Sequence, residues 1–161
     1  MAYETIIIRE ANRRDLKDIL RIINEYERYD LEFARRYYKR FFSNKSDEIT
    51  EKDKVYVALY GEDLAGVIGY CRDYFSTDYS YWLGWFVVKS KFRRNKIGTT
   101  LLGKVEKDLK ARKKRKLFVS TEDYNAVAKS FYTKNGFRTE GAVRDYYEKG
   151  EDQLIMSKTL S

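Results

Sequence analysis

The sequence predicts a mixed α/β fold, because strand and helix patterns alternate through its second half. An apolar run rich in aromatic and β-branched residues, from Trp82 to Val88, predicts a buried strand, and a basic loop separates it from a helix that begins at Ile97. Another short strand at residues 116–121 is followed by a helical segment at residues 124–135. This alternation predicts a right-handed crossover between two parallel strands. In units of this kind, ligands bind at the carboxyl ends of the strands.

The remaining segments predict antiparallel strands on either side of this unit, and hence a mixed sheet. Before it we expect a first strand, two helices of which the first is capped by Asn12 with Asp15 in its first turn, and a hairpin. After it we expect two closing strands joined by a turn. In order, these elements are residues 5–9, a helix after Asn12, 31–42, 55–60, 64–74, 137–143, a turn at 144–150, and 152–160.

Length and composition are typical of one domain, which we place at residues 1–161. The chain has 161 residues, of which 43% are hydrophobic, and no proline-, serine- or glycine-rich linker divides it. No apolar run reaches the roughly 20 residues of a membrane span, and the charged N-terminal segment does not fit a signal peptide. We therefore expect a cytoplasmic protein with no membrane partner.

The scarcity of cysteine and histidine restricts the chemistry. Cys71 is the single cysteine, so an internal disulfide is excluded, and the absence of histidine excludes a His-containing metal site and a Ser-His-Asp triad. We expect no metal. The net charge of +8 favours an anionic partner, which could be nucleic acid, a membrane surface or a phosphate-rich cofactor.

Two basic segments could bind such an anionic partner. The run at residues 110–116 is either a nucleic-acid patch or a solvated helix end whose cations complement the helix dipole, and we favour the latter because the run is short and holds no aromatic residue for base stacking. We therefore expect no nucleic-acid partner. The other segment holds Arg93, Arg94 and Lys96 just before the helix at Ile97. It is either a solvated loop or a phosphate site, since the first turn of a helix leaves backbone N–H groups unpaired.

Two motifs in this region resemble those of the GNAT superfamily of N-acetyltransferases. The segment RRNKIGTTLL at residues 93–102 resembles the pyrophosphate-binding motif R/Q-x-x-G-x-G/A, and NAVAKSFYTKNGF at residues 125–137 is similar to the second signature, N-x-x-A-x-x-x-Y-x-x-x-G-F. Lys96 stands where the first motif usually has its first glycine, but it can still offer a backbone N–H and adds a cation. The resemblance covers nearly the whole chain.

The resemblance implies a mostly antiparallel sheet with splayed central strands flanked by helices, and acetyl-CoA as cosubstrate. It also implies roles for particular residues. Asn125 would hold the pantetheine or the turn, and Tyr132 would protonate the departing thiolate. The oxyanion would meet backbone N–H groups at Phe86, Val87 and Val88, and the pyrophosphate would meet Arg93, Arg94, Asn95, Lys96, Ile97, Gly98 and Thr99.

The general base stays open at this stage. An amine with a pKa of about 10 must lose a proton before it attacks a thioester. Trp82 and Ser120 stand where relatives often place a catalytic glutamate. Glu122, two residues after Ser120 and on the same strand face, is our candidate. Alternatively, an ordered water molecule that passes the proton on to Tyr81, Ser120 or Glu122 is the base. Glu122 itself would otherwise be a solvated carboxylate in the turn.

The last strands and one helix give information on the class of acceptor substrate. The segment RDYYEKGEDQLIMSK resembles the terminal hairpin of the protein N-terminal and ribosomal-protein acetyltransferase branch, where a pair matching Tyr146 and Tyr147 borders the peptide groove. The aromatic residues at 31–42 are either core or the wall of an acceptor cleft.

We therefore predict transfer of an acetyl group to a primary amine by direct attack, at a protein or peptide N-terminus. The alternatives are a small amine of the polyamine type, or a non-catalytic module that binds acyl-CoA or nucleic acid. A homodimer is left open, because many relatives dimerise through their terminal strands.

Overall fold

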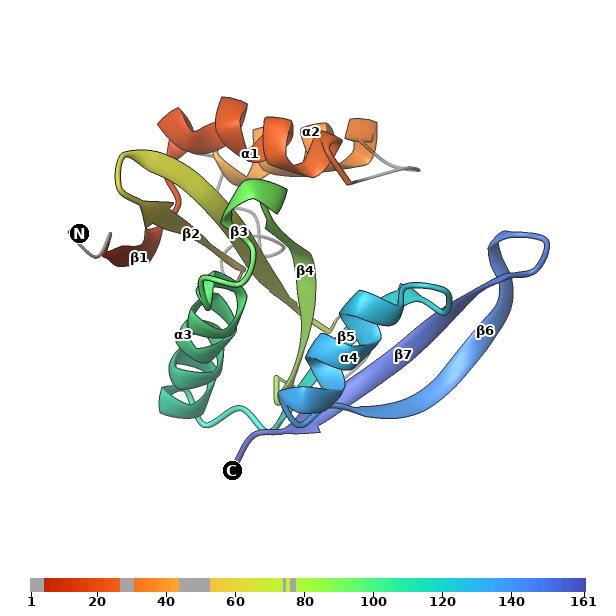
Figure 1. Ribbon diagram of the computed structural model, residues 1–161. Helices are drawn as coiled ribbons and strands as arrows, with labels where there is room; N and C mark the ends of the chain where they lie inside the picture. Colours follow the sequence, from red (N-terminus) through yellow and green to blue (C-terminus); the bar gives the residue numbers. More distant parts are fainter. Residues whose placement is uncertain (1–4, 27–30, 44–52, 74, 76–77) are drawn as a thin grey trace. The chain divides into compact units, whose positions relative to one another are not determined.

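A computed structural model of the protein describes residues 5–26, 31–43, 53–73, 75 and 78–161. Within these residues, seven strands form one sheet in the order β1-β2-β3-β4-β5-β7-β6, accompanied by four α-helices (Figure 1). The pairs β1–β2, β2–β3, β5–β7 and β6–β7 are antiparallel, and the pair β4–β5 is parallel. The predicted mixed α/β fold with a mostly antiparallel sheet is confirmed. None of the helices in the described part of the chain is long and apolar enough to cross a membrane.

The chain separates into two compact units. The N-terminal unit comprises residues 1–71 and 84–105, and the C-terminal unit comprises residues 72–83 and 106–161. Three elements pass from one unit into the other, namely β3 (Asp63–Arg72), by its last residue, β4 (Ser80–Val88) and α3 (Ile97–Ala111).

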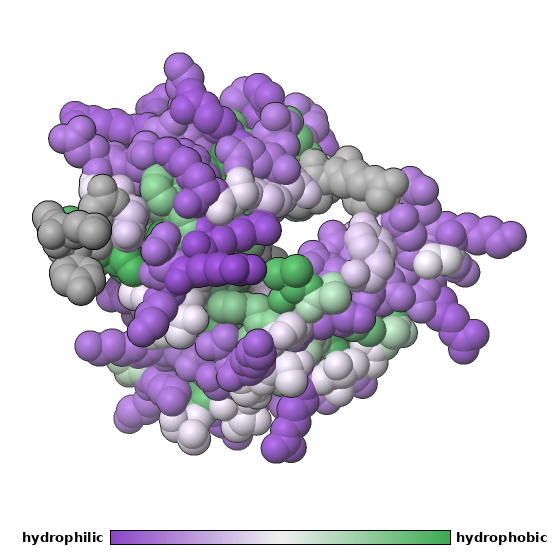
Figure 2. All heavy atoms as spheres, viewed as in Figure 1, coloured by the Kyte–Doolittle hydropathy of each residue, from purple (hydrophilic) through white to green (hydrophobic). Residues whose placement is uncertain are grey.

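The N-terminal unit contains three neighbouring antiparallel strands and two helices that lie side by side (Figure 1). One side of each helix packs into the apolar core, where Ile19, Ile23 and Tyr38 are fully buried against Val57. The outward side, at the top of the view, is covered by hydrophilic residues (Figure 2), as expected for amphipathic helices. The elements are β1 (Ile6–Glu10), α1 (Leu16–Asn24), α2 (Leu31–Phe41), β2 (Lys54–Tyr60) and β3 (Asp63–Arg72).

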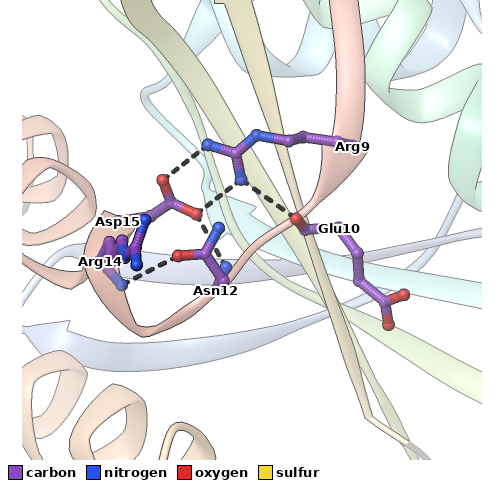
Figure 3. Close-up of polar contacts among 5 residues, drawn as sticks. All are labelled: Arg9, Glu10, Asn12, Arg14 and Asp15. Carbon is purple, nitrogen blue, oxygen red and sulfur yellow. Dashed lines mark hydrogen bonds and ion pairs between the residues drawn. The ribbon is translucent and has the colours of Figure 1, made fainter.

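The start of α1 is fixed by a polar network (Figure 3). The Asn12 side chain accepts a hydrogen bond from the Arg14 N–H at 3.0 Å, and the Asp15 carboxylate accepts one from the Asn12 N–H at 2.7 Å. The Arg9 guanidinium donates to both oxygens of Asp15 at 2.7 and 2.8 Å. Asn12 caps the 3₁₀ turn Arg13–Asp15 that leads into α1, so the predicted helix start is confirmed.

The C-terminal unit is built on a long hairpin (Figure 1). β7 pairs with β5 on one side and with β6 on the other, antiparallel in both cases. β4 joins β5 in parallel through three residue pairs, Ser80 to Trp82 with Lys116 to Phe118. The elements are β5 (Lys116–Glu122), α4 (Ala126–Lys134), β6 (Arg138–Glu148) and β7 (Glu151–Thr159).

The predicted turn at residues 144–150 is wrong, because β6 continues to Glu148. The strand is irregular between Val143 and Glu148, and Asp145 adopts a left-handed conformation with φ 50°. The Asp145 N–H donates to the Asp152 carboxylate at 2.9 Å, while its own carboxylate accepts from the Gly150 N–H at 2.6 Å. These bonds stabilise a bulge inside the strand, so only a short turn remains at its end.

The basic run at residues 110–116 binds to side chains of its own unit. Arg112 donates to the Tyr81 hydroxyl at 3.3 Å, and Lys114 forms an ion pair with Asp78 at 2.7 Å. Lys116 pairs with Glu140 at 3.3 Å. These contacts support the structural interpretation of the run over a nucleic-acid patch.

Candidate active site

The turn before α3 has an unusual backbone. Arg94 and Lys96 both adopt left-handed conformations, with φ of 68° and 61°. A side chain with a Cβ rarely adopts this conformation, whereas glycine does so readily. The positive φ gives a physical reason for the glycine that the resembling motif has at the position of Lys96. The left-handed conformation turns the chain so that α3 begins at residues 97–99. The N–H groups of these residues have no partner within the helix.

The cationic side chains of this turn have different environments. Arg93 lies over the Tyr26 ring, with its guanidinium carbon 4.7 Å from the ring centroid, and its Nε donates to the Val88 carbonyl at 3.5 Å. Arg93 therefore supports the loop. Arg94 and Lys96 are exposed. Asn95 donates to the Phe92 carbonyl at 3.2 Å, which closes the turn from within. A basic, N–H-rich turn of this kind fits the chemistry of a phosphate anion.

The end of β4 lies outside the β5 ladder. The register between the two strands stops at Trp82 and Phe118, although β4 continues to Val88. On the β3 side, a Cβ on Gly66 would stand 3.2 Å from the Val87 carbonyl oxygen, so the backbones approach closely there. The Lys89 N–H donates to the Ala65 carbonyl at 2.9 Å. Phe86, Val87 and Val88 therefore form a strand end held by β3.

Glu122 and Asn125 form the turn between β5 and α4 in the C-terminal unit. The Asn125 amide donates to the Glu122 carboxylate at 3.3 Å, and its oxygen accepts from the Ala128 N–H at 3.0 Å. Asn125 is therefore the N-cap of α4. The Thr121 hydroxyl also donates to Glu122, at 3.3 Å. These bonds fix the carboxylate of our candidate base in one orientation.

Tyr132 is buried on α4, with 7% of its surface exposed. Its ring lies 5.4 Å from that of Phe137 and 5.6 Å from that of Phe131, measured between centroids. Burial raises the pKa of Tyr132, and the nearby Glu122 carboxylate raises it further. The phenol therefore keeps its proton at neutral pH, as a proton donor must.

The other predicted site residues in the C-terminal unit differ in exposure. Tyr146 and Tyr147 make an edge-to-face contact with centroids 5.0 Å apart near the end of β6, and Tyr146 is 55% exposed. Ser120 is exposed on β5. Tyr81 is fully buried, and its hydroxyl donates to Asp78 at 3.1 Å and accepts from Arg112. These bonds give Tyr81 a structural role and weaken the water-relay alternative through it.

The structure thus groups the predicted residues into two sets. The β4 end and the turn at residues 93–99 belong to the N-terminal unit, while Glu122, Asn125, Tyr132 and the tyrosine pair belong to the C-terminal unit.

A cluster that sequence reasoning missed lies in the N-terminal unit. The rings of Phe33 and Tyr37 on α2 lie 5.8 and 5.3 Å from that of Trp85 on β4. The Tyr37 hydroxyl donates to the buried carboxylate of Asp53 at 3.0 Å. Asp53 and Trp85 have no local sequence pattern that connects them to α2. Only the aromatic content of residues 31–42 gave a signal, and it left core and cleft wall as alternatives.

With this geometry in view, comparison with protein families identifies the class of protein. The model of the acetyltransferase (GNAT) family matches residues 15–137, and the chain belongs to this family. The family assignment makes the protein an acetyltransferase. A search of curated proteins found no match.

Solved structures share the fold over nearly the full chain. A protein from Desulfovibrio desulfuricans described as a GNAT-family acetyltransferase superimposes with a TM-score of 0.86, at 20% identity over 98% of this chain and 100% of that one. The ribosomal-protein-S18-alanine N-acetyltransferase from Escherichia coli gives 0.79, at 18% identity over 98% and 95%. An aminoglycoside 6′-N-acetyltransferase complexed with coenzyme A gives 0.72, at 22% identity over 96% and 97%. At these identities the likeness shows the fold.

Proposed function

We propose that the protein is a single-domain enzyme that transfers the acetyl group of acetyl-CoA to a primary amine by direct attack. The observation that carries this proposal is the left-handed turn of Arg94 and Lys96 at the start of α3, in a chain that belongs to the acetyltransferase family. The residues fit the cosubstrate, because N–H groups and exposed cations suit a pyrophosphate. The relative solved with coenzyme A has the same fold.

The residues of this chain divide the chemical work. Acetyl-CoA would supply the acetyl group as a thioester. Residues 93–99 would bind the pyrophosphate, and the N–H groups at residues 86–88 would stabilise the negative charge that develops on the carbonyl oxygen. Tyr132, buried and protonated, would hold the proton for the sulfur. Glu122 would accept the amine proton, directly or through an ordered water.

Calorimetric titration with acetyl-CoA tests the cofactor site. The wild-type protein should bind with micromolar affinity, and a variant that combines Arg94→Glu with Gly98→Trp should not. Lys107→Glu is the matched control, because it reverses an exposed charge on α3 outside the turn and should leave the affinity unchanged. If the folded wild-type protein does not bind, the acetyltransferase proposal is wrong.

The acceptor we favour is a protein or peptide N-terminus, with a small amine as the alternative. The exposed Tyr146, paired with Tyr147, supports a peptide groove, and one relative acts on a ribosomal protein. Another relative acts on an aminoglycoside, which supports the small amine. A panel of peptides and small amines, assayed for acetyl transfer with wild-type protein and a Tyr146→Ala variant, distinguishes them. Selective loss of peptide acetylation is expected for a peptide groove.

A further inference from the structure

We propose that Phe33, Tyr37 and Trp85 form an aromatic box that binds a second nitrogen of the acceptor, one that stays protonated at neutral pH. The inference deepens the proposed function, on which it rests only in naming the ligand as the acceptor. It assigns a substrate class, namely amines that carry at least two basic nitrogens.

The aromatic box lies within the N-terminal unit and is partly open to solvent. Phe33 is 50% exposed on α2, while Tyr37 and Trp85 are partly buried at the edge of the core. Their ring planes are inclined to that of Trp85 by 42° and 48°. An ammonium group is attracted to the exposed face of an aromatic ring, because each face carries partial negative charge.

A buried carboxylate adds to this negative charge. Asp53 is 5% exposed and accepts the hydrogen bond of the Tyr37 hydroxyl at 3.0 Å. A phenol that donates to a carboxylate becomes more electron-rich, which strengthens the attraction of its ring for a cation. The pKa of Tyr37 is raised by burial and then by Asp53, so this hydroxyl stays protonated and continues to donate.

A second polar group beside the same indole is unsatisfied. Tyr38 is fully buried with its ring centroid 5.4 Å from that of Trp85, and within the described residues its hydroxyl has no hydrogen-bond partner. Buried hydroxyls nearly always have a partner, either in the protein or in an ordered water molecule. The Tyr38 hydroxyl oxygen can accept a hydrogen bond from an N–H group or from such a water molecule.

The group that the aromatic box selects differs from the nitrogen that reacts. Attack on a thioester requires a neutral amine, and a site that prefers an ammonium ion would oppose deprotonation. Trp85 directly precedes residues 86–88, where we place the developing oxyanion. The aromatic box therefore suits a second charged nitrogen on the same acceptor, as in a diamine or in a peptide with a basic residue after its N-terminus.

Tryptophan fluorescence can test the aromatic box without acetyl transfer. The chain has two tryptophans, so Trp82→Phe leaves Trp85 as the only reporter. We would titrate this protein with 1,5-diaminopentane and with 1-aminohexane, which share one ammonium group and a similar chain but differ in the second ammonium. The diamine should change the Trp85 emission saturably, with a dissociation constant at least roughly 3- to 10-fold lower than that of the monoamine.

Substitutions at Phe33 give the matched controls. Phe33→Leu keeps an apolar side chain but removes the π face, and should abolish most of the preference for the diamine, whereas Phe33→Tyr should retain it. Ile7→Ala changes a side chain of similar exposure, 52%, on β1 and should have no effect. Equal or tighter binding of 1-aminohexane, or an unchanged preference in Phe33→Leu, would overturn the inference and indicate an apolar pocket.

The two proposals can fail separately. Diamine binding at Trp85 without any acetyl transfer would leave the aromatic box intact and contradict the proposed function. Acetyl transfer to monoamines and diamines with equal kcat/KM, together with no selective change in Trp85 emission, would support the enzyme and contradict the aromatic box.

Discussion

Replacing Lys96 with glycine separates the geometry of the turn before α3 from its charge. Lys96 has φ 61°, and an L-residue in this conformation costs about 1–2 kcal/mol relative to glycine. Glycine gains more freedom in the unfolded chain, which offsets about 0.4–1 kcal/mol. Lys96→Gly should therefore stabilise the protein by about 0.5–1 kcal/mol, and raise Tm by about 1–4 °C for a chain of this length.

The same substitution should weaken acetyl-CoA binding. It removes one exposed cation beside the helix start, which corresponds to a roughly 2- to 5-fold loss of affinity. The assays are urea denaturation followed by fluorescence, and calorimetric titration with acetyl-CoA. Lys113→Gly is the matched control, because Lys113 also has a positive φ, 57°, in the turn that follows α3. It should gain similar stability without a change in affinity.

The reasoning would be refuted if Lys113→Gly gained stability while Lys96→Gly lost it. That result would mean that the Lys96 side chain makes stabilising contacts that outweigh its backbone strain. An increase in acetyl-CoA affinity in Lys96→Gly would show instead that turn geometry, rather than charge, limits binding.

Four further substitutions test other parts of the structure. Tyr132→Phe should lower kcat by about 100-fold or more while leaving the acetyl-CoA dissociation constant unchanged, and equal losses in both would contradict a general acid. Asp15→Asn should lower the free energy of unfolding by about 1–2 kcal/mol at neutral pH. Burial raises the pKa of Asp15, but hydrogen bonds from Arg9 and the Asn12 N–H outweigh it, so the pKa is lowered on folding. This stabilisation is present above the unfolded pKa of about 3.9 and is lost as pH falls through the lower folded pKa, so wild type and variant should converge in acid denaturation. Gly136→Ala should destabilise by about 1 kcal/mol, because Gly136 has φ +87°, whereas Gly103→Ala, in open space on α3, should stabilise by about 0.5–1 kcal/mol, both measured by thermal unfolding.

Local sequence patterns determined most of the secondary structure. The Asn12 cap, the helix from Ile97 and the strand from Lys116 were predicted because capping residues and apolar periodicity act over a few neighbouring residues. The motif residues around Lys96 and Tyr132 indicated the family for the same reason, since their spacing is fixed along the chain. The predicted turn at residues 144–150 was wrong because Asp145 depends on Asp152, a partner on the next strand.

The tertiary structure decided what individual side chains do. Asn125 caps α4 and orients Glu122, Arg93 packs on Tyr26, and Tyr37 binds Asp53 across 16 positions of the chain. Such contacts depend on how strands and helices pack, which the identity of neighbouring residues does not specify. The sequence by itself therefore determined the fold class and the family, whereas only the packed structure showed which charges support a loop and which aromatic rings pack together, because burial and pairing are properties of the folded chain.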